Sequence, residues 1–280
     1  MAERPSPIRR ILVALDASPA SRFAIETAVG LASRSRAKVV GLFVEDINLL
    51  RVARLPFVRE IATFSHAARP LEPGEMERQL RSQAERMRRA LGLAADLRDV
   101  PWQFRVRRGP VAVELMAAGA DADLMIMGRA GRRLAPVHRM GSTVRAMVLQ
   151  RSGMTFVLTS EYPSSAPAIA LFDGSAAGCK ALSIAGFLVE SQVRTLTVIL
   201  VADRRAEVQA LRETALRELE TFTLSGDFRV MVRPTHSSLG WLVRATGNGP
   251  VILPCGRDRL EGEPLCRLVD DIPNPVLVVR

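Results

Sequence analysis

Short apolar runs separated by helix-length segments dominate the first part of the chain. These runs are rich in β-branched residues and occupy residues 11–15, 38–44, 103–107, 124–127 and 155–158. Apolar strands that alternate with helices predict a parallel sheet covered by helices on both faces. Ser18 can cap a helix over residues 20–33, with Pro19 in its first position.

The same series returns in the second part of the chain. Its apolar runs occupy residues 169–172, 196–201, 228–232, 251–253 and 276–279. We therefore predict an α/β protein with two repeated domains, residues 1–160 and 161–280, each a doubly wound five-stranded parallel sheet. Right-handed crossovers favour the strand order 3-2-1-4-5 in each sheet. Residues 161–167, rich in Pro and Ser, form the predicted linker.

Matching positions set the register of the repeat. Asp16 and Asp173 follow the first runs 157 positions apart, whereas the Phe-Arg-Val triplets at 104–106 and 228–230 lie 124 positions apart. The first copy thus contains about 33 extra residues, roughly 47–75. This extra segment contains enough apolar side chains that it should pack against another surface. It could be a lid, an interdomain packing element or a dimer contact.

Charge is unevenly distributed between the copies. The net charge of +10 divides into +11 for residues 1–160 and −1 for residues 161–280. Five arginines lie among Glu77 and Glu85 in the predicted helix 75–91, a pattern that favours a solvated mixed-charge face over a nucleic-acid patch. Cys179, Cys255 and Cys266 are expected to be reduced thiols.

The chain has globular composition, with 48% hydrophobic and 24% charged residues in 280. The apolar run at 196–202 is far shorter than the ~20 residues needed to cross a bilayer. Residues 1–10 contain no apolar segment of the kind found in secretion signals. We therefore expect a soluble, cytoplasmic protein without a membrane partner.

Candidate chemistry follows the fourth apolar run. Gly128 and Gly131 are expected to take positive φ and turn their N–H groups inward, and Gly141-Ser142-Thr143 opens a predicted helix over 144–150. Unpaired amides and a helix dipole attract phosphate. The arginines close enough in sequence to add charge-assisted bonds are Arg129, Arg132, Arg133 and Arg139.

Asp16 lies at the end of the first strand, which neighbours the fourth strand in the predicted order. A ligand is expected in the crevice at the carboxyl ends of these two strands. Asp16 could instead only cap the turn at Ser18. Gly128 and the other glycines could also be ordinary turn residues.

The spacing G-x2-G-x9-G-(S/T), from Gly128 to Ser142, resembles the nucleotide motif of the universal stress protein family. The whole chain is similar to tandem two-domain members, which implies an adenine nucleotide alpha hydrolase-like fold and ATP, with or without Mg²⁺, as ligand. By this resemblance Asp16 and Val44 hold the ribose and adenine end, beside Ala14 and Leu15. The residues implied on the phosphate side are Met127, Gly128, Arg129, Gly131, Arg132, Gly141, Ser142 and Thr143.

The second copy departs from this motif. Gly256 is followed by Arg257-Asp258-Arg259, so a glycine is missing, and Glu261 and Glu263 would repel a phosphate placed there. We predict one nucleotide in the first domain and none in the second.

The resemblance implies a stress-response regulatory protein that acts through conformation or an unknown protein partner. No Glu or Asp lies between Gly128 and Gln150 to serve as catalytic base, so we expect no enzyme beyond a weak ATPase. The alternatives are a slow ATP hydrolase or nucleotidyl-transfer enzyme with Mg²⁺ on Asp16, and a dimeric scaffold that binds nothing. A homodimer or an intrachain pseudo-dimer is expected, through the fifth strands ending at Thr159 and Arg280.

Overall fold

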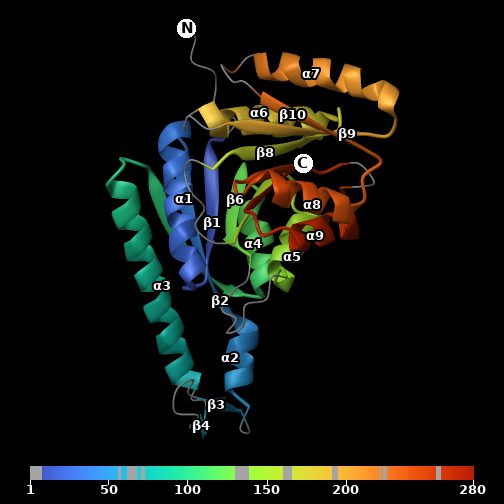
Figure 1. Cartoon of the computed structure of the whole chain (residues 1–280). Coiled ribbons are helices and arrows are strands. Elements are labelled where there is room, and N and C mark those ends of the chain that lie inside the picture. The colour runs from blue at the N-terminus through green and yellow to red at the C-terminus, as the bar shows by residue number, and fades with distance from the viewer. Residues whose placement is uncertain are drawn as a thin grey trace.

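The two series of apolar runs form one ten-stranded sheet in the computed structural model (Figure 1). The structure describes residues 8–55, 58–61, 68–70, 73–129, 139–159, 166–190, 195–220, 222, 226–256 and 260–280. The strands of the N-terminal half are β1 (Arg10–Leu15), β2 (Lys38–Asp46), β5 (Trp102–Gly109), β6 (Leu124–Gly128) and β7 (Met154–Leu158). Those of the C-terminal half are β8 (Ala168–Phe172), β9 (Leu196–Ala202), β10 (Gly226–Val232), β11 (Val251–Pro254) and β12 (Val276–Val279). Every predicted strand is present, with small differences at the ends.

The strands lie in the order β10-β9-β8-β11-β12-β7-β6-β1-β2-β5. Each half therefore has the order 3-2-1-4-5, and its strands are parallel. The two halves meet where β7 pairs antiparallel with β12, with Phe156 opposite Leu277. The fifth strands thus form the predicted contact within a single chain. Of the predicted linker, only Ala166 and Pro167 belong to the described residues.

Helices cover both faces of the sheet, as expected for a doubly wound fold. One face is covered by α1 (Pro19–Ser35), α3 (Pro73–Asp96), α6 (Ala176–Glu190) and α7 (Val208–Glu220). The other is covered by α4 (Val111–Gly119), α5 (Ser142–Gln150), α8 (His236–Thr246) and α9 (Gly262–Asp271). A short 3-10 helix, η1 (Arg205–Glu207), precedes α7. Within the described residues, no helix combines the length and apolarity needed to span a membrane.

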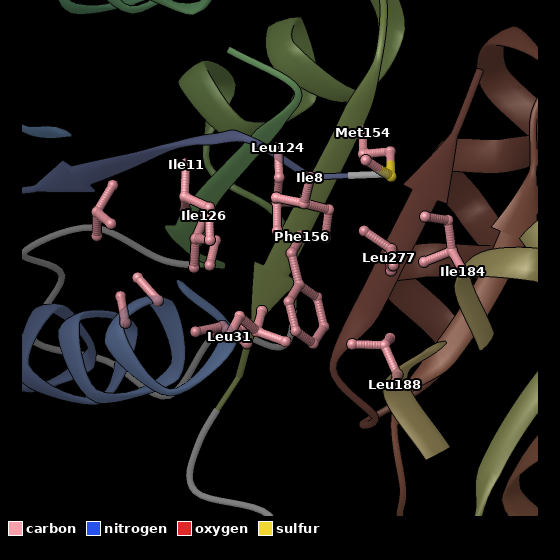
Figure 2. Packing of buried hydrophobic residues seen from close by; sticks show 14 of the residues in the cluster. Ile8, Ile11, Leu31, Leu124, Ile126, Met154, Phe156, Ile184, Leu188 and Leu277 are labelled. Carbon is pink, nitrogen blue, oxygen red and sulfur yellow. The ribbon is translucent and has the colours of Figure 1, made fainter. Parts of the chain in front are cut away.

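The core on the α1 face runs without interruption through the β7–β12 junction. Figure 2 shows Phe156 between Leu31 of the N-terminal half and Leu277, Ile184 and Leu188 of the C-terminal half. Phe156 is 1% exposed, so the junction is as dry as the interior of either half. Burial of this continuous apolar surface holds the two halves together.

The extra segment of the N-terminal half begins directly after β2. It forms α2 (Ile47–Ala53) and a small hairpin of β3 (Arg59–Ile61) and β4 (Ala68–Pro70), which lead into α3. In Figure 1 these elements project below the sheet together with the first turns of α3. Helix α3 is longer than the predicted helix 75–91, and its Arg88 pairs with Glu85 at 3.0 Å on an exposed face. The predicted mixed-charge surface is present there.

The helix after the first strand begins differently in the two halves. Ser18 occupies the N-cap position of α1 but makes no side-chain cap hydrogen bond, so the predicted cap is wrong. Its own N–H instead donates to Asp16 Oδ1 at 3.0 Å. In the C-terminal half, Ser175 Oγ accepts the Gly178 N–H at 3.0 Å, as a capping serine should.

The three cysteines are free thiols. Burial raises the pKa of Cys255 and Cys266, which pack in the core as small hydrophobic residues, and also that of the half-buried Cys179. Raised pKa values keep all three in the protonated form at neutral pH.

Candidate functional site

A cavity of about 370 Å³ opens at the carboxyl ends of β1, β2 and β6. The chain leaves β1 and β6 in opposite directions here, which makes this the point where open α/β sheets bind ligands. Its volume falls within the usual range for small-molecule sites. The wall is formed by Ala14, Leu15, Asp16, Leu42, Phe43, Val44, Asp46, Leu49, Leu80, Val111, Leu115, Met127, Gly128, Gly141, Ser142, Thr143 and Val144.

Nine of the predicted site residues meet in this wall, although they come from separate parts of the chain. They are Ala14, Leu15, Asp16, Val44, Met127, Gly128, Gly141, Ser142 and Thr143. Gly131 and Arg132, together with Arg133, lie outside the described residues. Arg139 is described and exposed, and it does not line the cavity.

Asp16 is held in a tight turn at the end of β1. Its Oδ1 accepts the Ser18 N–H at 3.0 Å and the Ser21 hydroxyl at 2.8 Å, and Ser21 Oγ accepts the Asp16 N–H at 3.0 Å. Ala17 completes the turn with a φ of 60°, a conformation that a non-glycine residue rarely adopts. Asp16 thus caps the turn, as one alternative predicted, and also faces the cavity. Among the described residues, its Oδ2 makes no hydrogen bond, so this oxygen can accept one from a ligand.

The opposite wall is the beginning of α5. Gly141 is its N-cap, with no side-chain cap bond, and Ser142 and Thr143 are its first residues. The first-turn amides of a helix have no partner within the helix, and the dipole gives this end a partial positive charge. Both hydroxyls add donors at the same end. This wall therefore has the chemistry to bind an anion.

Gly128 does not have the predicted backbone conformation. It is still paired with Leu158 in the β6–β7 ladder, which keeps it extended, and it is absent from the positive-φ glycines of the described chain. Gly128 lines the cavity because it is the last residue of β6. Without a side chain, it leaves room there for a ligand.

Arg129 also departs from its predicted role. Its side chain is buried and turns away from the cavity toward the C-terminal half, where Nη2 donates to the Asn274 carbonyl at 3.1 Å. Burial lowers the pKa of its guanidinium to about 10, and the nearby charge of Asp270 acts in the opposite direction. Arg129 therefore joins the two halves and is not part of the described cavity wall.

Sequence reasoning missed part of the wall. Asp46 ends β2 and caps α2, with its Oδ1 accepting the Asn48 N–H at 2.9 Å. The period of two along β2 could have found it, because Leu42 and Asp46 share the strand face of Val44. Leu49 of α2 and Leu80 of α3 carried no such signal, since nothing in the local pattern shows that α2 and α3 reach this cavity.

The charged side chains of the described cavity wall are all acidic. The described wall contains two carboxylates, Asp16 and Asp46, and no His, Lys or Arg. Asp16 follows β1 and Asp46 ends β2, whereas the first-turn amides belong to α5. Among the residues described, no group of three or more His, Cys, Asp or Glu could hold a metal ion. A base positioned to activate water beside the helix end is not found in this part of the chain.

The corresponding edge of the C-terminal half is built differently after its fourth strand. Leu260 is 2% exposed and packs into the core, and α9 then begins with Glu261 as N-cap and Glu263 in its first turn. Glu263 pairs with Arg145 of α5 and, at 3.6 Å, with Arg267. Carboxylates therefore replace the donors that α5 presents.

The likeness to known proteins extends over the whole architecture. The structure is similar to a universal stress protein from Archaeoglobus fulgidus DSM 4304, with a TM-score of 0.69, 15% sequence identity, and coverage of 97% of this chain and 96% of that chain. A putative universal stress protein from Pseudomonas aeruginosa UCBPP-PA14 matches with a TM-score of 0.60, 14% identity and coverage of 97% and 93%. At such identities the likeness concerns the fold.

Sequence comparison identifies the family independently of the fold. None of the curated proteins has a sequence that matches this chain. A model of the universal stress protein family matches residues 7–152, which is more than half of the chain and includes β1, β6 and the start of α5. The chain therefore belongs to the universal stress protein family.

Proposed function

We propose that this chain is a regulatory protein that binds one ATP in the cavity of its N-terminal half. The observation that carries the proposal is the pairing of Asp16 with the open N-terminus of α5 across one cavity at the switch point of the sheet. A carboxylate on one side and anion-binding amides on the other suit a ligand that has a sugar at one end and phosphates at the other.

In this proposal the ribose lies against Asp16, whose Oδ2 accepts a hydroxyl. The adenine lies among the apolar side chains beside Val44, where Leu49 of the extra segment and Leu80 of α3 complete the enclosure. The phosphates lie at Gly141, Ser142 and Thr143, with Mg²⁺ as counter-ion where it is bound. Family membership supports a role in which nucleotide occupancy changes conformation or partner binding.

We further propose that residues 1–160 and 161–280 are two domains and that the second binds no nucleotide. Glu261 and Glu263 at the start of α9 would face any phosphate placed there, and Leu260 is packed into the core. Repulsion at this helix end replaces the attraction offered by α5.

Calorimetric titration of ATP and adenosine tests the proposal. We expect one ATP per chain, and we expect Asp16→Asn to weaken binding of both ligands by roughly tenfold. Oδ1 is already used by Ser18 and Ser21, so in the variant the NH2 group takes the place of Oδ2, and a hydrogen bond to a charged acceptor, worth about 1.5–3 kcal/mol, is lost. Asp121→Asn removes a charge from a side chain that is 83% exposed and serves as control. Absence of ATP binding, or two sites per chain, would refute the proposal.

Phosphate release under multiple-turnover conditions separates this proposal from the enzyme alternative. A regulatory binder should release phosphate slowly. Rapid release that Asp16→Asn abolishes would instead assign an ATP-hydrolysing activity to the same cavity. Mass spectrometry of the gently purified protein would show whether a homodimer exists in addition to the junction within the chain.

A further inference from the structure

Helix α5 is held by the C-terminal half at three places along its length. Before its start, the Met140 N–H donates to Asp270 Oδ1 at 2.7 Å. In its middle, Arg145 pairs with Glu263 of α9. At its end, Arg280 Nη2 donates to the carbonyls of Val148 and Leu149 at 2.9 and 3.0 Å. The helix that presents its first amides to the cavity is therefore positioned by groups more than a hundred residues away in sequence.

The contact of Asp270 lies where β6 and α5 come together. The Gly141 N–H donates to the Arg129 carbonyl at 3.1 Å, which ties the residue after β6 to the residue before α5. The Arg129 guanidinium donates to the Asn274 carbonyl, and the charge of Asp270 lies close enough to affect it. Asp270 thus faces both ends of the connection between β6 and α5.

This anchor is a rigid part of the C-terminal half. Asn274 is 2% exposed, and its Nδ2 donates to the carbonyls of Gly247 and Gly249 at 2.9 and 2.8 Å. Gly249 lies so close to the Pro167 backbone that a Cβ at this position would overlap it. A segment packed in this way cannot shift without disturbing the core around it.

We propose that Asp270 is a positioning residue for the nucleotide site: by binding the Met140 amide it fixes the start of α5 at the distance where Gly141, Ser142 and Thr143 meet the phosphates. This inference rests on the proposed function. It gives the C-terminal half a role in a site whose lining includes none of the residues described in that half. Preorganised donors bind more tightly because the ligand does not have to order them first.

Charge and anchorage make opposite predictions for Asp270. A carboxylate near the phosphate end repels the ligand through space, so its removal by that effect alone would tighten ATP binding. Loss of the anchor would weaken ATP binding, because the first turn of α5 would have to be ordered by the ligand. Adenosine has no phosphate and should be insensitive to both effects.

The experiment is a calorimetric titration of ATP and adenosine into the full chain and three variants. Asp270→Ala removes the acceptor and the charge, and we expect it to weaken ATP binding about tenfold, the effect of losing one charged hydrogen bond. Asp270→Asn removes the charge but keeps an oxygen acceptor, so it should stay within about threefold of the parent. Asp271→Ala, an exposed aspartate next to it on α9, should bind like the parent. Adenosine affinity should be unchanged throughout.

Tighter ATP binding in both Asp270 variants would overturn the proposal in favour of simple repulsion. Equal losses for ATP and adenosine would overturn it in favour of a general structural role. If the parent protein binds neither ligand, the proposed function fails, and hydrogen exchange of residues 140–145 then tests the anchor alone. Faster exchange in Asp270→Ala, and not in Asp270→Asn or Asp271→Ala, would support the anchor, whereas unchanged exchange would refute it.

Discussion

The two halves have the same turn after their first strands, β1 and β8. They differ after their fourth strands, β6 and β11. Asp173 Oδ1 accepts the Ser175 N–H at 3.0 Å, just as Asp16 Oδ1 accepts the Ser18 N–H. After the fourth strand, however, α5 opens with a glycine and two hydroxyl residues, and α9 opens between two glutamates. Both halves have five strands in the same order and helices on both faces, so the fold depends on the core, whereas the proposed ligand site depends on a few residues at one helix end.

The largest expected effect is a loss of stability when the apolar core at the β7–β12 junction, which the two halves share, is disrupted. Phe156→Ala removes a buried ring from the β7–β12 junction and should lower the free energy of unfolding by about 3–5 kcal/mol, since the cavity it leaves lies in a continuous core. Leu277→Ala, across the junction, should cost about 2–5 kcal/mol. Urea denaturation followed by circular dichroism measures both. Leu97→Ala, at a side chain that is 85% exposed, is the control, and a cost as large as that of Phe156→Ala would contradict the core argument.

The next largest effect is expected on ATP affinity and should distinguish Asp16 from Asp173. Asp173→Asn should leave the affinity for ATP within about twofold of the parent, while Asp16→Asn weakens it by roughly tenfold, the value of one hydrogen bond to a charged group. Calorimetry of both variants side by side makes the comparison direct. Similar losses in the two variants would mean that the C-terminal half also contributes a nucleotide site.

A smaller effect is expected at the helix end itself. Ser142→Ala removes one neutral donor worth about 0.5–1.5 kcal/mol and should weaken ATP binding by roughly three- to tenfold, with adenosine unaffected. Ser152→Ala, at an exposed serine beyond the end of α5, should change neither ligand. Loss of adenosine binding in Ser142→Ala would show that the phosphates do not lie at α5.

The smallest effect tests the acidic helix end of the C-terminal half. Glu263→Gln breaks ion pairs whose side chains are at least 38% exposed, so the free energy of unfolding should fall by no more than about 1 kcal/mol. Glu220→Gln, at an exposed glutamate on α7, is the charge-matched control. A cost of several kcal/mol would show that the contact between α5 and α9 is a main support of the fold.

The strands and the position of the site followed from local patterns in the sequence. Apolar runs with β-branched residues marked each strand, and the G-x2-G-x9-G-(S/T) spacing marked Gly128, Gly141 and Ser142, which line the same cavity as Asp16. The direction of Arg129 could not be predicted, because it is set by Asn274 and Asp270, which lie far away in sequence. The same holds for Leu49, whose segment has no counterpart in the other half against which to align it.

The antiparallel pairing of β7 with β12 determines which strands remain at the edges of the sheet, where another chain could add a strand. Because the junction lies within one polypeptide, dilution cannot separate the halves. The edge strands of the sheet are β5 and β10. Charged side chains occupy both rims: Arg105 and Arg107 on β5, and Asp227 and Arg229 on β10. Such residues discourage the addition of further strands, so the covalent fusion buries the two fifth strands inside the sheet and leaves only charged strands at its two edges.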